Sequence, residues 1–192
     1  LHVFVDSPMA TEVTRITAQH FDLFDAEARR FAREPVPDGR APVLTFIETV
    51  EESKALNSAR GGAIIVAASG MCDGGRIRHH LRHHLSNPHT TVLFVGFQAE
   101  GTLGRRIVDG AQTVRIAGEE IAVRAEIVTL GGFSAHADRS ALLGWLAAFK
   151  SPPARIFLVH GEEDASRALA SAIGDRFGRS AEILGPHTSV AL

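Results

Sequence analysis

The sequence predicts an α/β protein, in which a lobe with a parallel sheet is followed by a smaller β/α segment. Short apolar runs alternate with helix-like stretches through the first two thirds of the chain. This alternation is typical of the βαβ units that build a parallel sheet. The chain has 192 residues, 45% of them hydrophobic, which is enough for one domain or two compact lobes with a core. With 22% charged residues and a net charge of -2, the composition argues against a disordered chain or a coiled coil.

The first β–α unit is expected in residues 1–39. Residues 3–6 form an apolar run that ends in aspartate, and the stretch after them places apolar residues at helix-like spacing as far as Phe31. Proline and glycine residues at 35–39 close this helix with a loop.

Two further strands are expected close behind. The second covers residues 43–47, and a helix follows it in which Thr49 is the N-cap and carboxylates fill the first turn. Gly61 and Gly62 stop that helix. The third strand covers residues 63–68, and its uninterrupted apolar sequence predicts burial on both faces.

The pattern of apolar residues changes at about residue 111, from alternating strands and helices to a hairpin. Before this point we expect a helix at 73–86, a strand at 91–96 and a short helix at 102–109. Alternating apolar residues at 113–116 and 121–130 then predict a hairpin with its turn at 117–119. The remaining elements are expected to be a helix at 138–149, a strand at 155–160, a helix at 165–177 and a strand at 181–184. We place a domain change near residue 125.

Composition also bears on the compartment. A single cysteine, Cys72, excludes an intrachain disulfide and suits a reducing, cytoplasmic location. The longest apolar run, residues 63–68, is far shorter than the roughly 20 residues that span a bilayer, so no membrane partner is expected. The chain begins with Leu1 at the start of a strand, and we expect it to be a piece of a longer protein.

Polar groups gather where predicted strands end, which is where α/β sheets bind ligands. Glycines and Arg76 fill the segment 69–76 after the third strand. Glycine N–H groups, a helix N-terminus and an arginine fork all suit a phosphate, although the segment matches no nucleotide-binding fingerprint. The structural alternative is a tight turn in which Asp73 caps a helix. A second glycine segment at 96–106 carries two arginines, for which a solvated helix face is the simpler interpretation.

Histidines offer a second kind of site. His136 and His160 follow strands and lie beside small residues, where an imidazole can bind metal or transfer a proton. The cluster at 79–84 has histidines at i, i+4 spacing. It lacks the glutamate and third ligand of a zinc site, so a surface or cleft-lining helix with Leu81 and Leu85 buried is favoured.

A serine hydrolase is one hypothesis for the second half of the chain. Ser134, Asp164 and His187 occur in the order of an α/β-hydrolase triad. Against it, a bulky His136 replaces the second glycine of the nucleophile elbow, and the spacing between Ser134 and Asp164 is short. Ser134 then fits better as a cap or a phosphate contact.

Five motifs in order carry a resemblance to a known family. They are VDSPMATE at 5–12, ASGMCDGGR at 68–76, VGFQAEGTLG at 95–104, GFSAHAD at 132–138 and VHGE at 159–162. Together they resemble the RNA-processing metallo-β-lactamase proteins with a β-CASP insertion, in particular the bacterial and archaeal ribonucleases related to the eukaryotic pre-mRNA cleavage and polyadenylation endonuclease. The resemblance covers nearly the whole chain.

The resemblance implies an organisation and a chemistry. Residues 1–124 would be most of the β-CASP lobe, and residues 125–192 would be the C-terminal part of the metallo-β-lactamase domain. His160 matches a zinc ligand of the family, and His136 matches a histidine beside the scissile phosphate. In the intact enzyme two zinc ions would hold the hydroxide that attacks an RNA phosphodiester. The phosphate backbone would be positioned by Ser69, Gly70, Gly74, Gly75, Arg76, Ser134 and Ala135.

The departure from the family pattern is as informative as the match. The family's main metal motif, His-x-His-x-Asp-His, is absent from these residues, and one histidine does not make a catalytic zinc site. We therefore expect this chain alone neither to bind the two zinc ions nor to cleave RNA. The alternative is a non-catalytic RNA-binding module.

The charge pattern bears on the RNA partner. Five arginines concentrate in the two strand–helix segments expected to line the cleft, namely Arg76, Arg78, Arg82, Arg105 and Arg106. Acids concentrate at 26–34 and 48–52, so a net charge of -2 does not exclude RNA. Aromatic residues make up 6% of the chain, and we expect recognition of the RNA backbone rather than of bases. Unpaired strands at the edge of the incomplete second half also predict self-association, such as a homodimer.

Overall fold

The computed structural model describes residues 1–34, 42–58, 61–133 and 136–191. It divides into two compact units, Leu1–Gly132 and Phe133–Leu192, and each is described by itself. Of the described helices, none has the length and apolar character that a membrane span requires.

A three-stranded parallel sheet opens the first unit. Its strands are β1 (His2–Asp6), β2 (Val43–Phe46) and β3 (Ala63–Ala67), in the order β2-β1-β3. In register, Val5 lies opposite Phe46 on one side and Val66 on the other. The parallel sheet predicted from the alternation of strands and helices is confirmed, with β1 in its centre.

The second pair of parallel strands joins distant parts of the unit. Strand β4 (Thr91–Phe94) pairs with β7 (Glu126–Thr129). An antiparallel hairpin of β5 (Thr113–Ile116) and β6 (Glu119–Ala122) lies between them in sequence. Its turn places Ala117 and Gly118 at positive φ, as a two-residue type I′ turn requires.

The predicted second arm of the hairpin, residues 121–130, is wrong as a single strand. The backbone N–H groups of Arg124 and Ala125 both donate to the carbonyl oxygen of Leu85. These bonds take the chain out of the hairpin, and the arm is therefore divided into β6 and β7.

Capping side chains explain where the helices of the first unit begin. Ser7 caps α1 (Pro8–Gln19), Asp25 caps α2 (Ala26–Arg33) and Thr102 caps α5 (Leu103–Val108). Thr49 and Glu52 form the expected capping box at α3 (Val50–Ala55). The other elements are the 3₁₀ turns η1 (Phe21–Leu23) and η3 (Leu56–Ser58) and the helix α4 (Ile77–His84).

The helix predicted at 73–86 is shorter than expected, because residues 73–76 stay in a loop. Arg76 is the N-cap of α4 and makes no side-chain capping bond. Asp73 caps nothing in α4; its carboxylate accepts instead from the N–H of Leu103, at the start of α5.

The core of the first unit lies around α4, α5 and the hairpin. Leu81 and Leu85 are fully buried, as predicted for the apolar stripe of α4. They belong to one cluster with Phe94, Ile107 and Val114. The same cluster includes Cys72 and Leu103, one from each of the two predicted glycine segments. Burial of the cluster therefore stabilises both segments together.

One predicted burial is wrong. Ile64 and Val66 of β3 are each 46% exposed, so β3 is covered on one face and not on both. Helix α1 has no buried residue, and its apolar residues Met9, Val13 and Ile16 face solvent at i, i+4, i+7 spacing. Ile64 and Val66 are therefore partly open to solvent among the described residues.

The second unit is small. It contains α6 (Arg139–Ala147), which Asp138 caps, and α7 (Glu163–Phe177), which ends at Gly178 in the left-handed conformation. A short parallel pair, β8 (Phe157–Leu158) and β9 (Glu182–Ile183), accompanies them. A 3₁₀ turn, η4 (Gly131–Phe133), spans the division between the units.

Candidate functional site

A buried carboxylate stands at the carboxyl end of the central strand. Asp6, the last residue of β1, is fully buried. Its Oδ2 accepts from Ser53 Oγ at 2.5 Å and from His80 Nε2 at 2.6 Å, and its Oδ1 accepts from Arg76 Nη1 at 2.5 Å. Three donors from three different segments therefore converge on one side chain.

The hydrogen bonds keep this carboxylate ionised. Burial by itself raises the pKa of Asp6 and is the largest single influence on it. The hydrogen bonds from Ser53, His80 and Arg76 together outweigh burial and hold the pKa below its ordinary value. Since an ionised carboxylate only accepts, the imidazole of His80 donates from Nε2. Its Nδ1 is buried without a partner among the described residues.

The loop 69–76 leads from β3 to α4 and has a defined internal geometry. The N–H of Ser69 donates to the carbonyl of Gly74, and the N–H of Ile77 donates back to the carbonyl of Ala68. Gly75 has φ +75, and a Cβ built on it would lie 2.3 Å from the Ala68 oxygen. Only glycine fits at position 75, whereas Gly70 and Gly74 have open space around them.

A second glycine-rich loop, 95–102 after β4, is joined to the first. The Nε2 atom of Gln98 donates to the carbonyl of Gly70 at 3.0 Å. The N–H of Gly104 donates to the carbonyl of Met71 at 3.0 Å. With the Asp73–Leu103 bond already described, these contacts make the two loops one structural element, which we call the paired loops.

The paired loops offer donors that an anion could use. Within the described ranges, the backbone N–H groups of residues 73–76 donate to no protein acceptor. They precede an eight-residue helix, whose N-terminus favours negative charge. An arrangement of this kind can bind a phosphate oxygen without a bound cation.

The arginines predicted to line this region are largely committed to the protein. Arg76 donates to Asp6 and to the carbonyls of residues 47 and 48. Arg82 pairs with Glu119 of the hairpin, and Arg105 pairs with Asp109. Arg78 donates to the carbonyl of Asp73. The positive charge of this region is therefore smaller than the sequence suggests.

The histidine cluster of α4 behaves as predicted for a structural helix, with one exception. His79 and His83 are exposed, while His80 is buried against Asp6. Burial, followed by the nearby His80 and His83, lowers the pKa of His84. Nothing in the spacing of the histidines distinguished His80 from its neighbours, so this contact was missed.

Sequence reasoning also missed Asp6, Ser53 and Gln98. Asp6 stands at the point where an apolar strand meets a helix cap, which is a usual place for a functional carboxylate in α/β proteins. That position was a usable signal. Ser53 and Gln98 carried none, because only the fold brings them to their partners.

The predicted residues of the second unit lie in exposed segments. His160 follows β8 with φ +63 and is exposed, and His136 is exposed two residues before the cap of α6. The predicted phosphate contacts Ser134 and Ala135 lie outside the described residues. The structure therefore gives no distances from them to other groups.

The surroundings of His160 bear on the predicted zinc site. In the described ranges, no three or more His, Cys, Asp or Glu side chains are grouped so that they could hold a metal ion. His160 thus belongs to no such group in the part of the chain that the structure describes, and its role as a zinc ligand stays a prediction.

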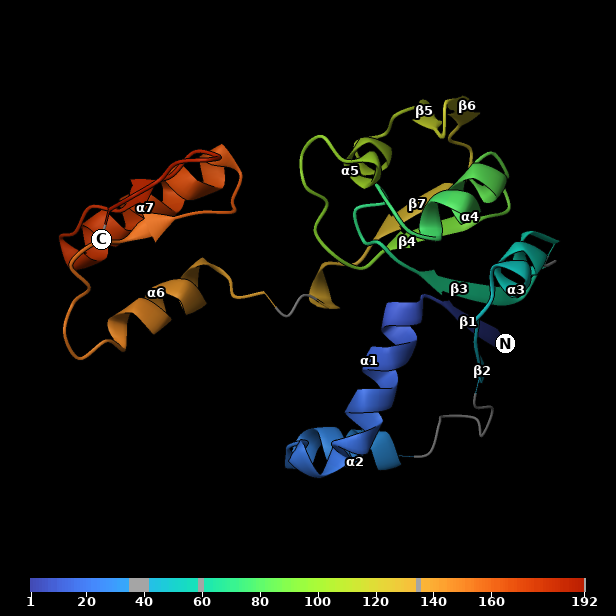
Figure 1. Cartoon of the computed structure of the whole chain (residues 1–192), viewed down its shortest axis with the longest axis horizontal. Helices are drawn as coiled ribbons and strands as arrows, with labels where there is room; N and C mark the ends of the chain where they lie inside the picture. Colours follow the sequence, from blue (N-terminus) through green and yellow to red (C-terminus); the bar gives the residue numbers. More distant parts are fainter. Residues whose placement is uncertain (35–41, 59–60, 134–135, 192) are drawn as a thin grey trace. The chain divides into compact units, whose positions relative to one another are not determined.

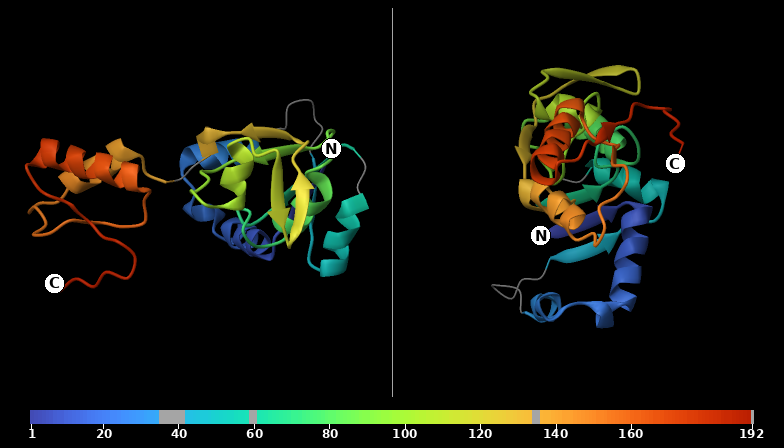
Figure 2. Two further views of the ribbon diagram at one scale, coloured as in Figure 1. Left: turned by 90° about the horizontal axis from the view of Figure 1, so that it is seen from above. Right: turned by 90° about the vertical axis from the view of Figure 1, so that its left-hand side faces the viewer.

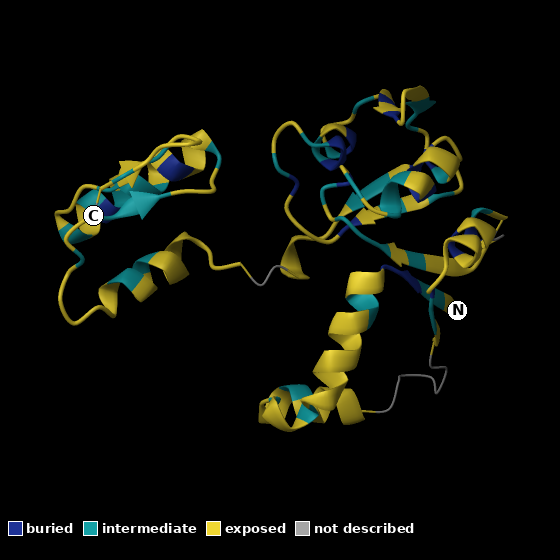
Figure 3. Cartoon of the chain, in the orientation of Figure 1, coloured by how far each residue is buried: buried dark blue, intermediate teal, exposed yellow. Residues whose placement is uncertain are grey.

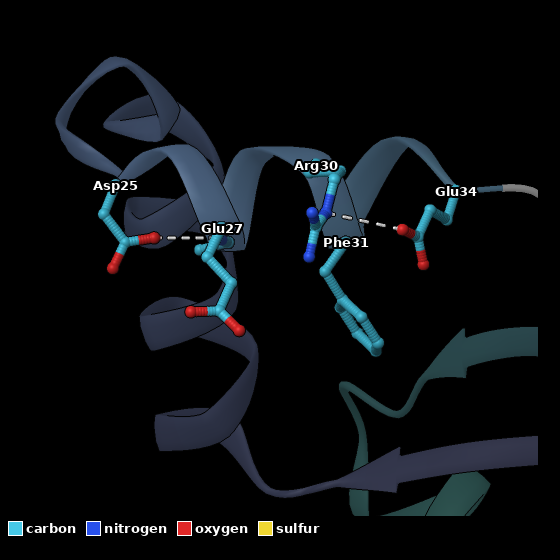
Figure 4. A pocket seen from close by; sticks show the side chains of 6 residues that line it. Asp25, Glu27, Arg30, Phe31 and Glu34 are labelled. Carbon is cyan, nitrogen blue, oxygen red and sulfur yellow. Dashed lines mark hydrogen bonds and ion pairs between the residues drawn. The ribbon is translucent and has the colours of Figure 1, made fainter.

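A hollow on the surface lies elsewhere and has a different character. It is formed along α2 by Asp25, Arg30, Phe31 and Glu34, together with two neighbours. Figure 4 shows Asp25 capping the helix and Arg30 paired with Glu34, at 3.6 Å. Phe31 is 78% exposed. The hollow contains none of the predicted site residues.

Comparison with known proteins gives two matches in series. Residues 1–107 match the model of the β-CASP domain, and residues 120–184 match the model of a Zn-dependent metallo-hydrolase RNA specificity domain. Neither match is to a serine hydrolase, so that alternative has no support. The matched ranges leave 108–119 between them, and the boundary near residue 125 stays a prediction.

Several curated proteins are similar to this chain. Ribonuclease TTHA0252 of Thermus thermophilus is 42% identical over 174 residues, which are 91% of this chain and 39% of that protein. The transcription termination factor FttA of Pyrococcus abyssi is 33% identical over 187 residues, 92% of this chain and 29% of the relative. FttA of Thermococcus kodakarensis is 36% identical over 144 residues, which are 72% of this chain and 22% of that protein. The chain spans less than half the length of these relatives.

Proposed function

Because the chain belongs to the β-CASP family of metallo-β-lactamase RNA-processing proteins, we propose that it is the RNA-holding part of a zinc-dependent ribonuclease. The observation that carries this proposal is the series of two family matches, a β-CASP domain followed by an RNA specificity domain. The paired loops, at the carboxyl ends of two strands of the matched β-CASP region, are the place where we expect RNA to bind.

The RNA phosphates are proposed to bind to backbone N–H groups first. The residues proposed for this role are Gly70, Gly74, Gly75 and Arg76 of the first unit and Ser134 and Ala135 of the second. Ser69, which the sequence also predicted, differs from them, because its N–H and its hydroxyl both donate to the carbonyl of Gly74. The support in the first unit is the set of unused N–H groups at 73–76. Backbone dipoles do not displace counterions as arginines do, so RNA binding should depend weakly on salt. The net charge of -2 agrees with this mode of binding.

The two exposed histidines are proposed to serve the cleavage step. His160 would be one ligand of a two-zinc centre in a chain that also carries a His-x-His-x-Asp-His motif. His136 would act beside the scissile phosphate. Residues 1–192 alone are proposed to bind RNA without cleaving it, because the described residues contain no group of three metal ligands.

The lack of a group of three metal ligands among the described residues also favours a second candidate, a non-catalytic RNA-binding module. In a longer chain that carries the metal motif, His136 and His160 contribute to cleavage under the first candidate and do not under the second. A cytoplasmic location and a homodimer remain predictions under both.

The test uses two proteins. In a longer chain with the metal motif, His160→Ala should lower zinc content and activity, and His136→Ala should lower activity while zinc content stays normal. Full activity and normal zinc in both variants would show that His136 and His160 take no part in catalysis, and residues 1–192 would then be an RNA-binding module beside the catalytic residues. The 192-residue chain should bind RNA in an anisotropy titration and show no cleavage; cleavage that a chelator abolishes contradicts the proposal. A fluorophosphonate should label neither protein, and labelling at Ser134 would revive the serine hydrolase.

A further inference from the structure

We propose that Asp6, Arg76 and His80 are positioning residues for the loop 69–76, and that Arg76 acts on RNA through this loop rather than by touching a phosphate. The inference rests on the proposed function, since it specifies how the proposed phosphate-binding loop is given its shape. It also assigns a role to Asp6, which the sequence left without one.

Burial is the first argument. Asp6 is fully buried, the His80 side chain is 6% exposed and that of Arg76 is 18% exposed. A phosphate could not reach Asp6 or His80 without opening the protein. A buried carboxylate that accepts three hydrogen bonds is instead a fixed point to which other segments are attached.

The donors of Arg76 are the second argument. Its Nη1 donates to Asp6 Oδ1 at 2.5 Å and to the carbonyl of Ile47 at 3.1 Å. Its Nη2 donates to the carbonyl of Glu48 at 2.9 Å. The guanidinium therefore spans from the end of β1 to the residues that follow β2. Its planar fork makes these three bonds in one orientation, which commits three of its five N–H donors to the protein.

The position of Arg76 in the chain completes the inference. Arg76 is the last residue of the loop and the N-cap of α4, and His80 lies one turn further along the same helix. Asp6 thus fixes the start of α4 at two points. The loop closes against this fixed end through the bonds of Ser69 with Gly74 and of Ile77 with Ala68. The unused N–H groups of residues 73–76 therefore lie between the bonds that close the loop and the start of α4 that Asp6 fixes.

The first experiment measures RNA affinity against salt. The 192-residue chain is titrated into a fluorescein-labelled oligouridylate at a series of potassium chloride concentrations, with Asp6→Asn, Arg76→Gln and the double variant beside it. Arg30→Gln on α2, which also removes an arginine paired with a carboxylate, is the matched control. We expect each single variant to weaken RNA binding about tenfold, an order-of-magnitude value for one misplaced recognition loop, and the double variant to be no worse than either.

The salt dependence separates positioning from direct contact. A lost phosphate contact lowers the slope of log affinity against log salt by about 0.7 for single-stranded RNA. A lost positioning residue leaves the slope unchanged. A lower slope in Arg76→Gln alone, with Asp6→Asn like the unchanged chain, overturns the inference in favour of direct contact. Arg30→Gln should change neither affinity nor slope.

The second experiment does not depend on RNA. Hydrogen exchange in Asp6→Asn and in Arg76→Gln should become faster at the amides of Ser69, Cys72 and Ile77, which are bonded within the loop. Amides of the hairpin, 113–122, should keep their rates. Faster exchange everywhere would indicate general destabilisation, and unchanged exchange in the loop refutes positioning. If the unchanged chain binds no RNA while loop exchange responds as expected, the proposed function fails and the positioning role stands.

Discussion

Replacing Gly75 by alanine tests whether the loop that follows β3 has a left-handed residue at position 75 and approaches Ala68 closely there. Two costs are expected. An L-residue at φ +75 costs about 1–2 kcal/mol in the left-handed region. The added Cβ would also lie 2.3 Å from the oxygen of Ala68 and 2.9 Å from the nitrogen of Ser69. Both atoms are backbone, so relief requires a shift of the loop, and overpacking of this kind costs about 1–3 kcal/mol.

The expected loss in the free energy of unfolding is therefore about 1–5 kcal/mol, after a gain of about 0.4–1 kcal/mol from the stiffer unfolded chain. Two matched glycines separate the contributions. Gly118 has φ +86 and open space, so Gly118→Ala should show the conformational cost alone. Gly74 has open space and no positive φ, so Gly74→Ala should change stability by less than about 0.5 kcal/mol.

Urea unfolding followed by far-UV circular dichroism measures all three variants. Fluorescence is the wrong probe, because the single tryptophan, Trp145, belongs to the second unit. If Gly75→Ala is no less stable than Gly118→Ala, the close approach of the loop to Ala68 is refuted. If it equals Gly74→Ala, the left-handed conformation is refuted as well.

Three further predictions concern the surroundings of this loop. Gly104→Ala should lower stability by about 1–3 kcal/mol, because its Cβ would lie 1.8 Å from Gln98 Oε1; in a Gln98→Ala background the urea-midpoint loss should shrink, and an equal loss in both contradicts the contact. Burial, and then the charge of a neighbouring aspartate, raises the pKa of Cys72 to about 11, so iodoacetamide at pH 8 should alkylate the folded chain about 100-fold more slowly than the unfolded one. Equal alkylation rates in the folded and the unfolded chain would show that the Cys72 thiol is accessible. The raised pKa also means that the free energy of unfolding falls as pH rises from about 9 towards 11, because the thiol loses its proton more readily in the unfolded chain. Thr49→Ala should cost about 1 kcal/mol through loss of the capping box with Glu52, and an unchanged urea midpoint would show that the cap contributes nothing.

The sequence predicted well those features that local chemistry decides. Thr49 and Asp138 were expected to start helices, and both cap them. The alternation of residues 113–116 with the Ala117-Gly118 turn gave the hairpin. Leu81 and Leu85 were expected on the buried side of α4 and are in the core. In each case the signal lies within a few residues of the feature.

Features that depend on distant partners were not predictable in this way. Arg124 and Ala125 leave the hairpin because the Leu85 carbonyl accepts from both of their N–H groups. Asp73 bonds to the start of α5 instead of capping α4. Arg76 was expected to face a phosphate because its neighbours are glycines, and its partner Asp6 is 70 positions away. Local periodicity contains no information about such contacts.

The distance along the chain between Asp6 and its partners sets an order of events during synthesis. Asp6 leaves the ribosome before its partners, and Arg76 and His80 follow 70 and 74 positions later. Contacts of such large sequence separation form slowly, because the intervening loop must close first. Until residues 76 and 80 have been translated, Ser53 is the one partner of the Asp6 side chain among those described above. The loop 69–76 therefore gains its attachment to Asp6 only after Arg76 and His80 have been made, and a nascent chain that ends before residue 76 lacks it.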